Sequence, residues 1–170
     1  MNNAVTETIM TDTSAPTANV RTAEYTGILP SQKIRAMVDN DEIKTVVRPL
    51  DPDQIQPASI DLRLGDWAYP VDTSFLPGKG VRVFEKMKEL DDQYDRFKID
   101  LRNGAVLEKG RIYVIQLIEA IDLRSEVAAF ANPKSSTGRL DILTRLIANE
   151  AEVFDQVNEG YKGELYIEVA

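Results

Sequence analysis

The sequence contains neither cysteine nor histidine. The absence of cysteine excludes disulfide bonds, and the absence of both residues excludes zinc sites that depend on thiolate and imidazole ligands. Ser-His-Asp and Cys-His catalysis are excluded as well, because both need an imidazole base. If the chain is an enzyme, its acid–base group is therefore Asp, Glu, Lys or Tyr, or its contribution is electrostatic.

The sequence also lacks an excess of positive charge and a long apolar run. Its formal net charge is −8, whereas a nucleic-acid-binding protein usually presents a basic face. An anionic small substrate would require cations gathered at one place. No stretch approaches the ~18 apolar residues of a membrane-spanning helix, and the N-terminus lacks the basic start and apolar centre of a signal peptide. We therefore expect a cytoplasmic protein that binds neither nucleic acid nor membranes.

The length of 170 residues and the hydrophobic content of 43% predict one domain with its own core. Residues 1–23 are rich in Thr, Ala and Asn, and we expect them to form a disordered tail. Residues 24–170 are expected to form the folded domain. The chain stops inside an apolar alternation that is typical of a strand, so C-terminal strands of the domain are expected to be missing.

Short apolar runs separated by turn residues dominate the folded part. Residues 60–64 alternate apolar and charged side chains and predict a strand that ends at Gly65, and residues 69–71 predict a further short strand. Residues 111–121 are rich in β-branched side chains and predict one or two buried strands. Residues 164–169 alternate again and predict the last strand. This spacing favours a mainly β fold, a barrel or jelly roll with a few short helices.

Two segments carry a helical pattern. Pro30 and Ser31 predict a helix start, followed by an apolar face that includes Ile34 and Met37. Residues 83–94 fit a short amphipathic helix, with an irregular insertion as the alternative.

The first candidate site places two serines and two cations within six residues. Ser135 or Ser136 is positioned to cap a following helix, whose first N–H groups would bind an anion beside Lys134 and Arg139. A phosphate would be expected here. The alternative is an ordinary serine cap with surface cations.

The second candidate is the turn Gly160-Tyr161-Lys162-Gly163, which leads into the last strand and to Glu168. Glu168 lies on the strand face opposite the apolar residues, so it is either solvent-facing or a general base in a partly buried cleft. The third candidate is Asp61 with Arg63, which share one strand face; a structural pair is favoured there.

Together these segments resemble the dCTP deaminases. Residues 27–31 look like the opening of that family, and residues 55–65 look like its first strand signature. Residues 134–139 are similar to its Arg-Ser-Ser-x-x-Arg motif, and residues 160–168 to its Gly-[Tyr/Trp]-x-Gly-x-x-x-x-Glu motif. The sequence of residues 131–139 most resembles the N-terminal half of the longer, two-domain bacterial dCTP deaminases.

The resemblance implies a dUTPase-like fold and a zinc-independent conversion of dCTP to dUTP and ammonia. Glu168 would match the catalytic glutamate that activates water. Ser135 and Arg139 would match residues that orient the water, the base and the tetrahedral intermediate. Lys134 and Ser136 would match phosphate-contacting positions, with Lys in place of the family's Arg.

The resemblance also implies a homotrimer with shared active sites and Mg²⁺ that enters with the triphosphate. Tyr161 would contact substrate, and Asp61 would lie near the Mg²⁺-triphosphate. Asn158 stands where the related dUTP diphosphatases carry aspartate, which argues against dUTP hydrolysis, although Asp155 and Glu159 are nearby. Two alternatives therefore remain, a non-catalytic nucleotide-binding or structural half-domain and, less favoured, a dUTP diphosphatase.

Overall fold

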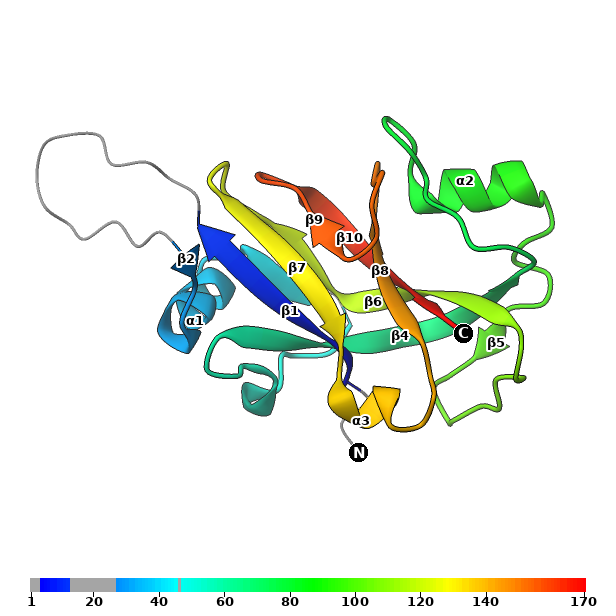
Figure 1. The fold of residues 1–170 in the computed structure, drawn as a ribbon, viewed down its shortest axis with the longest axis horizontal. Helices are drawn as coiled ribbons and strands as arrows, with labels where there is room; N and C mark the ends of the chain where they lie inside the picture. The colour runs from blue at the N-terminus through cyan, green and yellow to red at the C-terminus, as the bar shows by residue number, and fades with distance from the viewer. Residues whose placement is uncertain (1–3, 13–26, 46) are drawn as a thin grey trace, which may run out of the picture.

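A computed structural model describes residues 4–12, 27–45 and 47–170 (Figure 1). Its strands are β1 (Ala4–Asp12), β2 (Gly27–Ile28), β3 (Ile43–Thr45), β4 (Ser59–Val71), β5 (Ile99–Asp100), β6 (Ile112–Asp122), β7 (Val127–Pro133), β8 (Thr144–Ala148), β9 (Gln156–Val157) and β10 (Lys162–Val169). Its helices are α1 (Ser31–Asp39), α2 (Val83–Leu90) and α3 (Ser135–Gly138), with one 3-10 turn, η1 (Pro52–Gln54).

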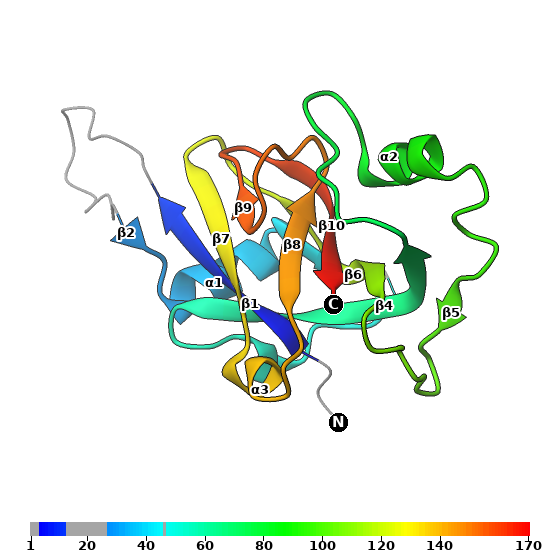
Figure 2. The ribbon, with the colours of Figure 1, turned by 45° about the vertical axis from the view of Figure 1, so that its right-hand side comes forward.

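The strands form one antiparallel sheet that curls back on itself (Figure 2). The order is β8-β10-β6-β4-β1-β7-β9, and β2, β3 and β5 pair with β1, β6 and β4. β8 and β7 stand far apart in this order, yet Asp155 joins them. Its N–H donates to the Leu146 carbonyl at 3.0 Å, and its carbonyl accepts from the Ala131 N–H at 2.9 Å. The curled sheet encloses the larger part of the apolar core.

Both faces of β10 are covered. Leu165 and Ile167 face the larger apolar cluster, whereas Tyr166 and Glu168 point to the other side of the sheet. On that side Phe84 of α2 packs edge-on against Tyr166, with ring centroids 5.2 Å apart. The segment between β4 and β5, which includes α2, therefore covers the sheet face that carries Glu168.

β4 differs from the sequence prediction. The strand expected to end at Gly65 and the one expected at residues 69–71 are a single continuous strand. A Cβ atom on Gly65 would lie 2.5 Å from the Gln116 carbonyl oxygen of β6. The register between the two strands shifts between Leu64 and Ala68. This glycine thus marks a close backbone approach in a bulged strand, and its interpretation as a strand end was wrong.

The N-terminal segment also differs from the prediction. Residues 4–12, expected in a disordered tail, form β1, which pairs with β4 on one side and β7 on the other. Thr6 and Met10 are buried, and the Thr6 hydroxyl donates to the Asn132 carbonyl at 2.9 Å. Composition did not reveal these partners because both lie far along the chain. The rest of the expected tail lies outside the described residues.

The helices agree with the apolar patterns. α1 begins at Ser31 and buries Ile34 and Met37, as predicted. The expected helix in residues 83–94 is α2, which ends at Leu90. Within the described part of the chain, no helix is both long and apolar enough to cross a membrane.

Candidate active site

Glu168 is a buried carboxylate near the end of β10. The antiparallel register places it opposite Arg145 of β8 and Val114 of β6, and only 2% of its surface is exposed. Its Oε1 accepts from Arg145 Nε at 3.1 Å and from Arg145 Nη2 at 2.5 Å. Its Oε2 is buried and has no hydrogen-bond partner among the described residues. The interpretation as a solvent-facing edge residue was wrong, because the segment that contains α2 covers this face.

Arg145 was not among the residues predicted for the site. It lies in β8, between the buried residues Thr144 and Leu146. Its Nη2 donates to the Ser74 hydroxyl at 2.8 Å, and its Cζ lies 4.1 Å from the centroid of the Phe154 ring. A single cation inside a short apolar run is the sequence signal that could have identified it.

The α3 motif is arranged differently from the prediction. The helix has only four residues and begins at Ser135, with Lys134 as its N-cap and no side-chain capping hydrogen bond. The expectation that Ser135 or Ser136 caps a helix was therefore wrong. Both serines and Arg139 are exposed, because the short helix lies on the surface after β7.

Lys134 is the member of this motif that turns inward. Its Nζ forms an ion pair with the Asp61 carboxylate. Asp61 is only 3% exposed, so Lys134 supplies the charge partner that a buried carboxylate needs.

The chain does not bring α3 and Glu168 together. Across the described ranges, no hydrogen bond or ion pair joins Ser135, Ser136 or Arg139 to Glu168. α3 and the C-terminal end of β10 are separate in both views of the ribbon (Figures 1 and 2).

Tyr161 holds the turn before β10. Its hydroxyl donates to the Glu164 carbonyl at 2.6 Å and accepts from the Asn149 N–H at 3.0 Å. Burial raises the pKa of Tyr161. Gly160 has a φ of +67°, and a Cβ on Gly163 would lie 3.0 Å from the Tyr161 hydroxyl oxygen. Both glycines are thus needed for the turn, and any contact of Tyr161 with substrate falls to its ring.

A polar cleft opens beside this turn. Its volume is about 610 Å³, and Asn158 and Tyr161 line it together with Lys79, Arg82 and Lys162. Arg82 and Lys162 are each paired with a carboxylate, at 2.8 and 2.7 Å. Glu150, Glu152 and Glu164 line it as well, so the cleft combines amide, aromatic, cationic and carboxylate groups, which suit a polar ligand.

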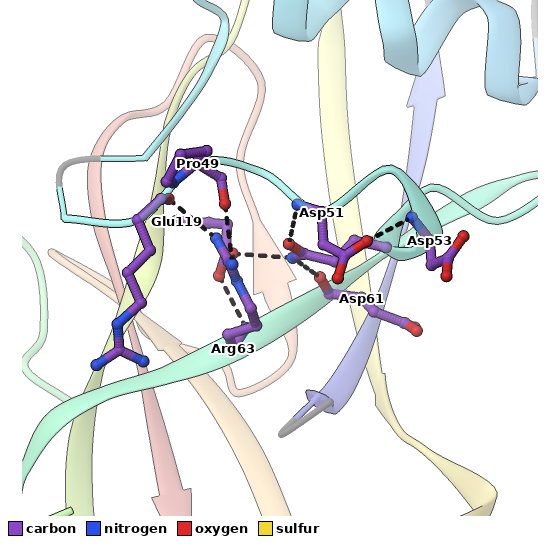
Figure 3. A network of polar contacts seen from close by, with 8 residues as sticks. Pro49, Asp51, Asp53, Asp61, Arg63 and Glu119 are labelled. Carbon is purple, nitrogen blue, oxygen red and sulfur yellow. Dashed lines mark hydrogen bonds and ion pairs between the residues drawn. The ribbon is translucent and has the colours of Figure 1, made fainter. Parts of the chain in front are cut away.

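The predicted pair between Asp61 and Arg63 does not form, and each side chain has another partner (Figure 3). Arg63 donates from its backbone N–H and from Nε to the two oxygens of Glu119, each at 2.8 Å. Gln54 Nε2 donates to Glu119 at 2.9 Å and to the Asp61 carbonyl at 2.6 Å. Two neighbouring side chains of β4 thus pair with different elements, and Glu119 has both oxygens satisfied.

The carboxylates that the structure describes do not form a protein-held metal site. In residues 4–12, 27–45 and 47–170, no group of three or more His, Cys, Asp or Glu side chains is arranged to hold a metal ion. Asp61, the candidate for a position near Mg²⁺, is already paired with Lys134. The donor set therefore does not fit a resident Mg²⁺ ion.

Most of the chain matches a known protein family. Residues 25–170 match the model of the 2'-deoxycytidine 5'-triphosphate deaminase (DCD) N-terminal domain. The chain belongs to the dCTP deaminase family. The α3 motif, the Tyr161 turn and Glu168 all lie inside the matched region, whereas β1 lies outside it.

Individual dCTP deaminases agree with this assignment. The dUMP-forming dCTP deaminase of Persephonella marina is 29% identical over 145 residues, which cover 83% of this chain and 70% of that protein. The dUMP-forming enzyme of Nocardioides sp. is 31% identical over 142 residues, which cover 79% of this chain and 64% of that protein.

A solved structure, the 2'-deoxycytidine 5'-triphosphate deaminase of Agrobacterium tumefaciens, aligns with a TM-score of 0.79 and 48% identity. The alignment covers 85% of this chain and 41% of that one, so this chain spans less than half the length of the solved relative. The expected fold, mainly β and dUTPase-like with a few short helices, is confirmed.

Proposed function

We propose that this chain carries out the hydrolytic deamination of dCTP to dUTP and ammonia, with Glu168 as the general base. The observation that carries the proposal is the buried Glu168 carboxylate, which has one oxygen held by Arg145 and the other without a partner among the described residues. The absence of histidine and cysteine from the sequence leaves a carboxylate as a suitable proton carrier. The names of the relatives in the family support the choice of dCTP.

Glu168 would carry the protons through the steps of the deamination. Water attacks C4 of the cytosine ring while Glu168 accepts its proton, and a C–O bond forms in a tetrahedral intermediate. The carboxylic acid passes this proton to ring N3, then accepts the proton of the new C4 hydroxyl and delivers it to the exocyclic amine, so that the C–N bond breaks, ammonia leaves and the C4 carbonyl of the product forms. The sum is dCTP plus water giving dUTP plus ammonia.

We propose that the site is completed between subunits of a homotrimer. Ser135 and Arg139 are exposed on α3 and make no contact with Glu168 within the described chain, so they would meet a substrate on Glu168 of another subunit. There they would orient the water and stabilise the intermediate. Lys134 and Ser136 would contact the phosphates, and Lys134 would then exchange part of its interaction with Asp61 for the substrate.

Mg²⁺ is proposed to arrive with the nucleotide. Because the described residues offer no carboxylate cluster and Asp61 is paired with Lys134, the triphosphate oxygens would supply its ligands. No step of the deamination is assigned to the ion. Tyr161 would contribute its ring to nucleotide binding beside the polar cleft, and the cytoplasm is the proposed location because nucleotide precursors are used there.

Two other functions compete with this proposal. The relatives from Persephonella and Nocardioides are named dUMP-forming, so the same site would also release pyrophosphate if the chain behaved as they are named. Asn158, which lines the cleft and stands where the related dUTP diphosphatases carry aspartate, favours dUTP as the final product. Alternatively the chain is a non-catalytic half, since it spans only 41% of the solved relative.

Product analysis separates these possibilities. Purified protein is incubated with dCTP and Mg²⁺, and ammonia, dUTP, dUMP and pyrophosphate are measured, with dUTP as a parallel substrate. We expect ammonia and dUTP without pyrophosphate, and a loss of about 10²–10⁴-fold in Glu168→Gln. Release of dUMP would assign the bifunctional reaction, and nucleotide binding without ammonia would assign the non-catalytic half.

A mixing experiment tests the shared site. Glu168→Gln and Arg139→Ala are each expected to be inactive alone. Dissociated and reassembled together, they are expected to regain part of the activity, because some interfaces then combine Arg139 of one subunit with Glu168 of another. No recovery in a confirmed mixed oligomer would place both residues in the same subunit's site or remove Arg139 from it.

A further inference from the structure

We infer that Arg145 is the positioning residue for Glu168, because its guanidinium occupies Oε1 and leaves Oε2 as the one carboxylate oxygen without a partner among the described residues. The inference rests on the proposed role of Glu168 and adds a residue that lies outside the motifs that identify the family. It concerns how the carboxylate is oriented and does not require Arg145 to touch substrate.

The register of β8 and β10 places the Arg145 and Glu168 side chains next to each other. Glu168 and Arg145 face each other directly across the β8–β10 pair, and side chains at such positions project from the same sheet face about 5 Å apart. A guanidinium on β8 therefore meets the carboxylate on β10 without any loop movement. Two donors of Arg145, Nε at 3.1 Å and Nη2 at 2.5 Å, converge on the same oxygen.

Arg145 is itself held in place. Nη2 is shared with the Ser74 hydroxyl at 2.8 Å, and the Phe154 ring lies 4.1 Å from Cζ. Ser74 follows β4, and Phe154 lies between β8 and β9, so the guanidinium is fixed from two further segments. Because the guanidinium is planar and anchored at three places, it fixes the orientation of the carboxylate it binds.

The second buried Glu–Arg pair of this molecule provides an internal reference. Glu119 is 0% exposed and bonded to Arg63, as Glu168 is 2% exposed and bonded to Arg145. In the Glu119 pair both oxygens accept hydrogen bonds, since Oε2 binds the Arg63 backbone N–H and Oε1 binds two side chains (Figure 3). In the Glu168 pair both donors converge on Oε1.

An unpartnered buried oxygen is costly, so folded proteins rarely keep one without a use. Among the described residues two buried side-chain atoms lack a partner, Glu168 Oε2 and the Thr144 hydroxyl. Only the former belongs to an ionisable group. The comparison with Glu119 shows that this fold can satisfy a buried glutamate completely. We take the unpartnered Oε2 as the atom that exchanges a proton with water and the leaving amine, and Oε1 as the fixed end.

The first test measures the environment of the Glu168 carboxyl group and does not require enzymatic turnover. Protein is labelled with ¹³C at the glutamate carboxyl carbon, and the Glu168 signal is assigned by its loss in Glu168→Gln. We expect Arg145→Lys and Arg145→Ala to move this signal, and Arg63→Lys to leave it in place while moving that of Glu119. A Glu168 signal that is the same in wild type and in a folded Arg145 variant would overturn the inference.

The second test reads its consequence for the reaction. A displacement of about 1 Å in a catalytic group costs roughly 100-fold in rate, so Arg145→Ala should lower kcat by about that factor with little change in KM. Methylguanidinium added at millimolar concentration should restore part of kcat in Arg145→Ala, because it refills the position of the lost group. Arg63→Lys should retain kcat. Unchanged kcat in Arg145→Ala would refute the positioning role.

The two proposals fail in different ways. If wild-type protein makes no ammonia from dCTP, the proposed function fails, and the carboxyl signal still decides whether Arg145 orients Glu168. If Glu168→Gln keeps full turnover, the general-base role fails. Should Arg145→Ala not fold, Arg145→Lys decides the inference in both tests, because it keeps the positive charge and loses the planar pair of donors.

Discussion

Replacing Arg63 by alanine tests the assignment of the Glu119 network as structural. The change removes the guanidinium from a carboxylate with 0% exposure. Breaking a buried ion pair by deleting one partner costs about 3–5 kcal/mol. We expect the lower end, about 3 kcal/mol, because Glu119 keeps the bond from Gln54 and the bond from the backbone N–H of residue 63, which alanine also provides.

A double-mutant cycle isolates the pair itself. Glu119→Gln should cost about 1–3 kcal/mol, since Arg63 then loses a charge-assisted acceptor while 13% exposed. The double variant Arg63→Ala/Glu119→Gln should cost less than the sum, with a coupling of about 1–2 kcal/mol. Urea unfolding can be followed by the fluorescence of Trp67, the single tryptophan. A loss of 3 kcal/mol would lower the midpoint by about 1–2 M.

Two results would contradict the structural role of the Arg63–Glu119 pair. If the two single changes add within about 0.5 kcal/mol, the pair contributes nothing beyond its separate side chains, and its use as the reference for Glu168 falls with it. Deamination per folded molecule should be the same in Arg63→Ala and wild type under conditions where both are folded. A selective loss of turnover would instead place Arg63 in the reaction.

Three further predictions use other parts of the structure. Gly65→Ala should lower stability by about 2 kcal/mol or more, because the new methyl would lie 2.5 Å from the Gln116 carbonyl oxygen; an unchanged urea midpoint would contradict the close approach. Burial raises the pKa of Asp155 above its ordinary value of 3.8. A carboxyl with a raised folded-state pKa stabilises the fold at low pH and loses that contribution as pH rises through the raised value, so Asp155→Asn, which keeps an acceptor for β8, should raise the melting temperature at pH 7 and not at pH 3. Lys134→Met should cost about 1–3 kcal/mol because it leaves Asp61 buried and unpaired; thermal unfolding at equal melting temperature would show that this ion pair is not needed.

Periodicity predicted the elements whose side chains alternate clearly. β6 and β10 were predicted because β-branched and apolar residues recur along them, and α1 because Ile34 and Met37 fall on one face. Gly65 was misread because a glycine inside a strand and a glycine at its end look the same in sequence. The difference depends on the Gln116 backbone of another strand, which no local pattern contains.

The candidate site was predicted only in part, because its contacts also depend on segments that are distant in the sequence. Glu168 follows from the alternation of the last strand and from the family motif, but its burial depends on the segment that contains α2 packing over that face. Arg145 was missed because β8 is only five residues long and its partner is set by register. The capping role of Ser135 was wrong because the helix begins one residue earlier than the pattern suggested, with Lys134 at its N-cap.

The position of β1 has a consequence for how the chain reaches its native state. Thr8 lies opposite Ile60 on one side and Ala131 on the other, so β1 cannot complete its hydrogen bonds until β7 has been synthesised. Pairings between such distant segments close large loops and fold slowly. We expect the sheet to be finished late, with an unpaired, β-branched segment exposed until then. A boundary drawn at residue 25, where the family match begins, would leave the facing edges of β4 and β7 open and favour edge-to-edge aggregation over native folding.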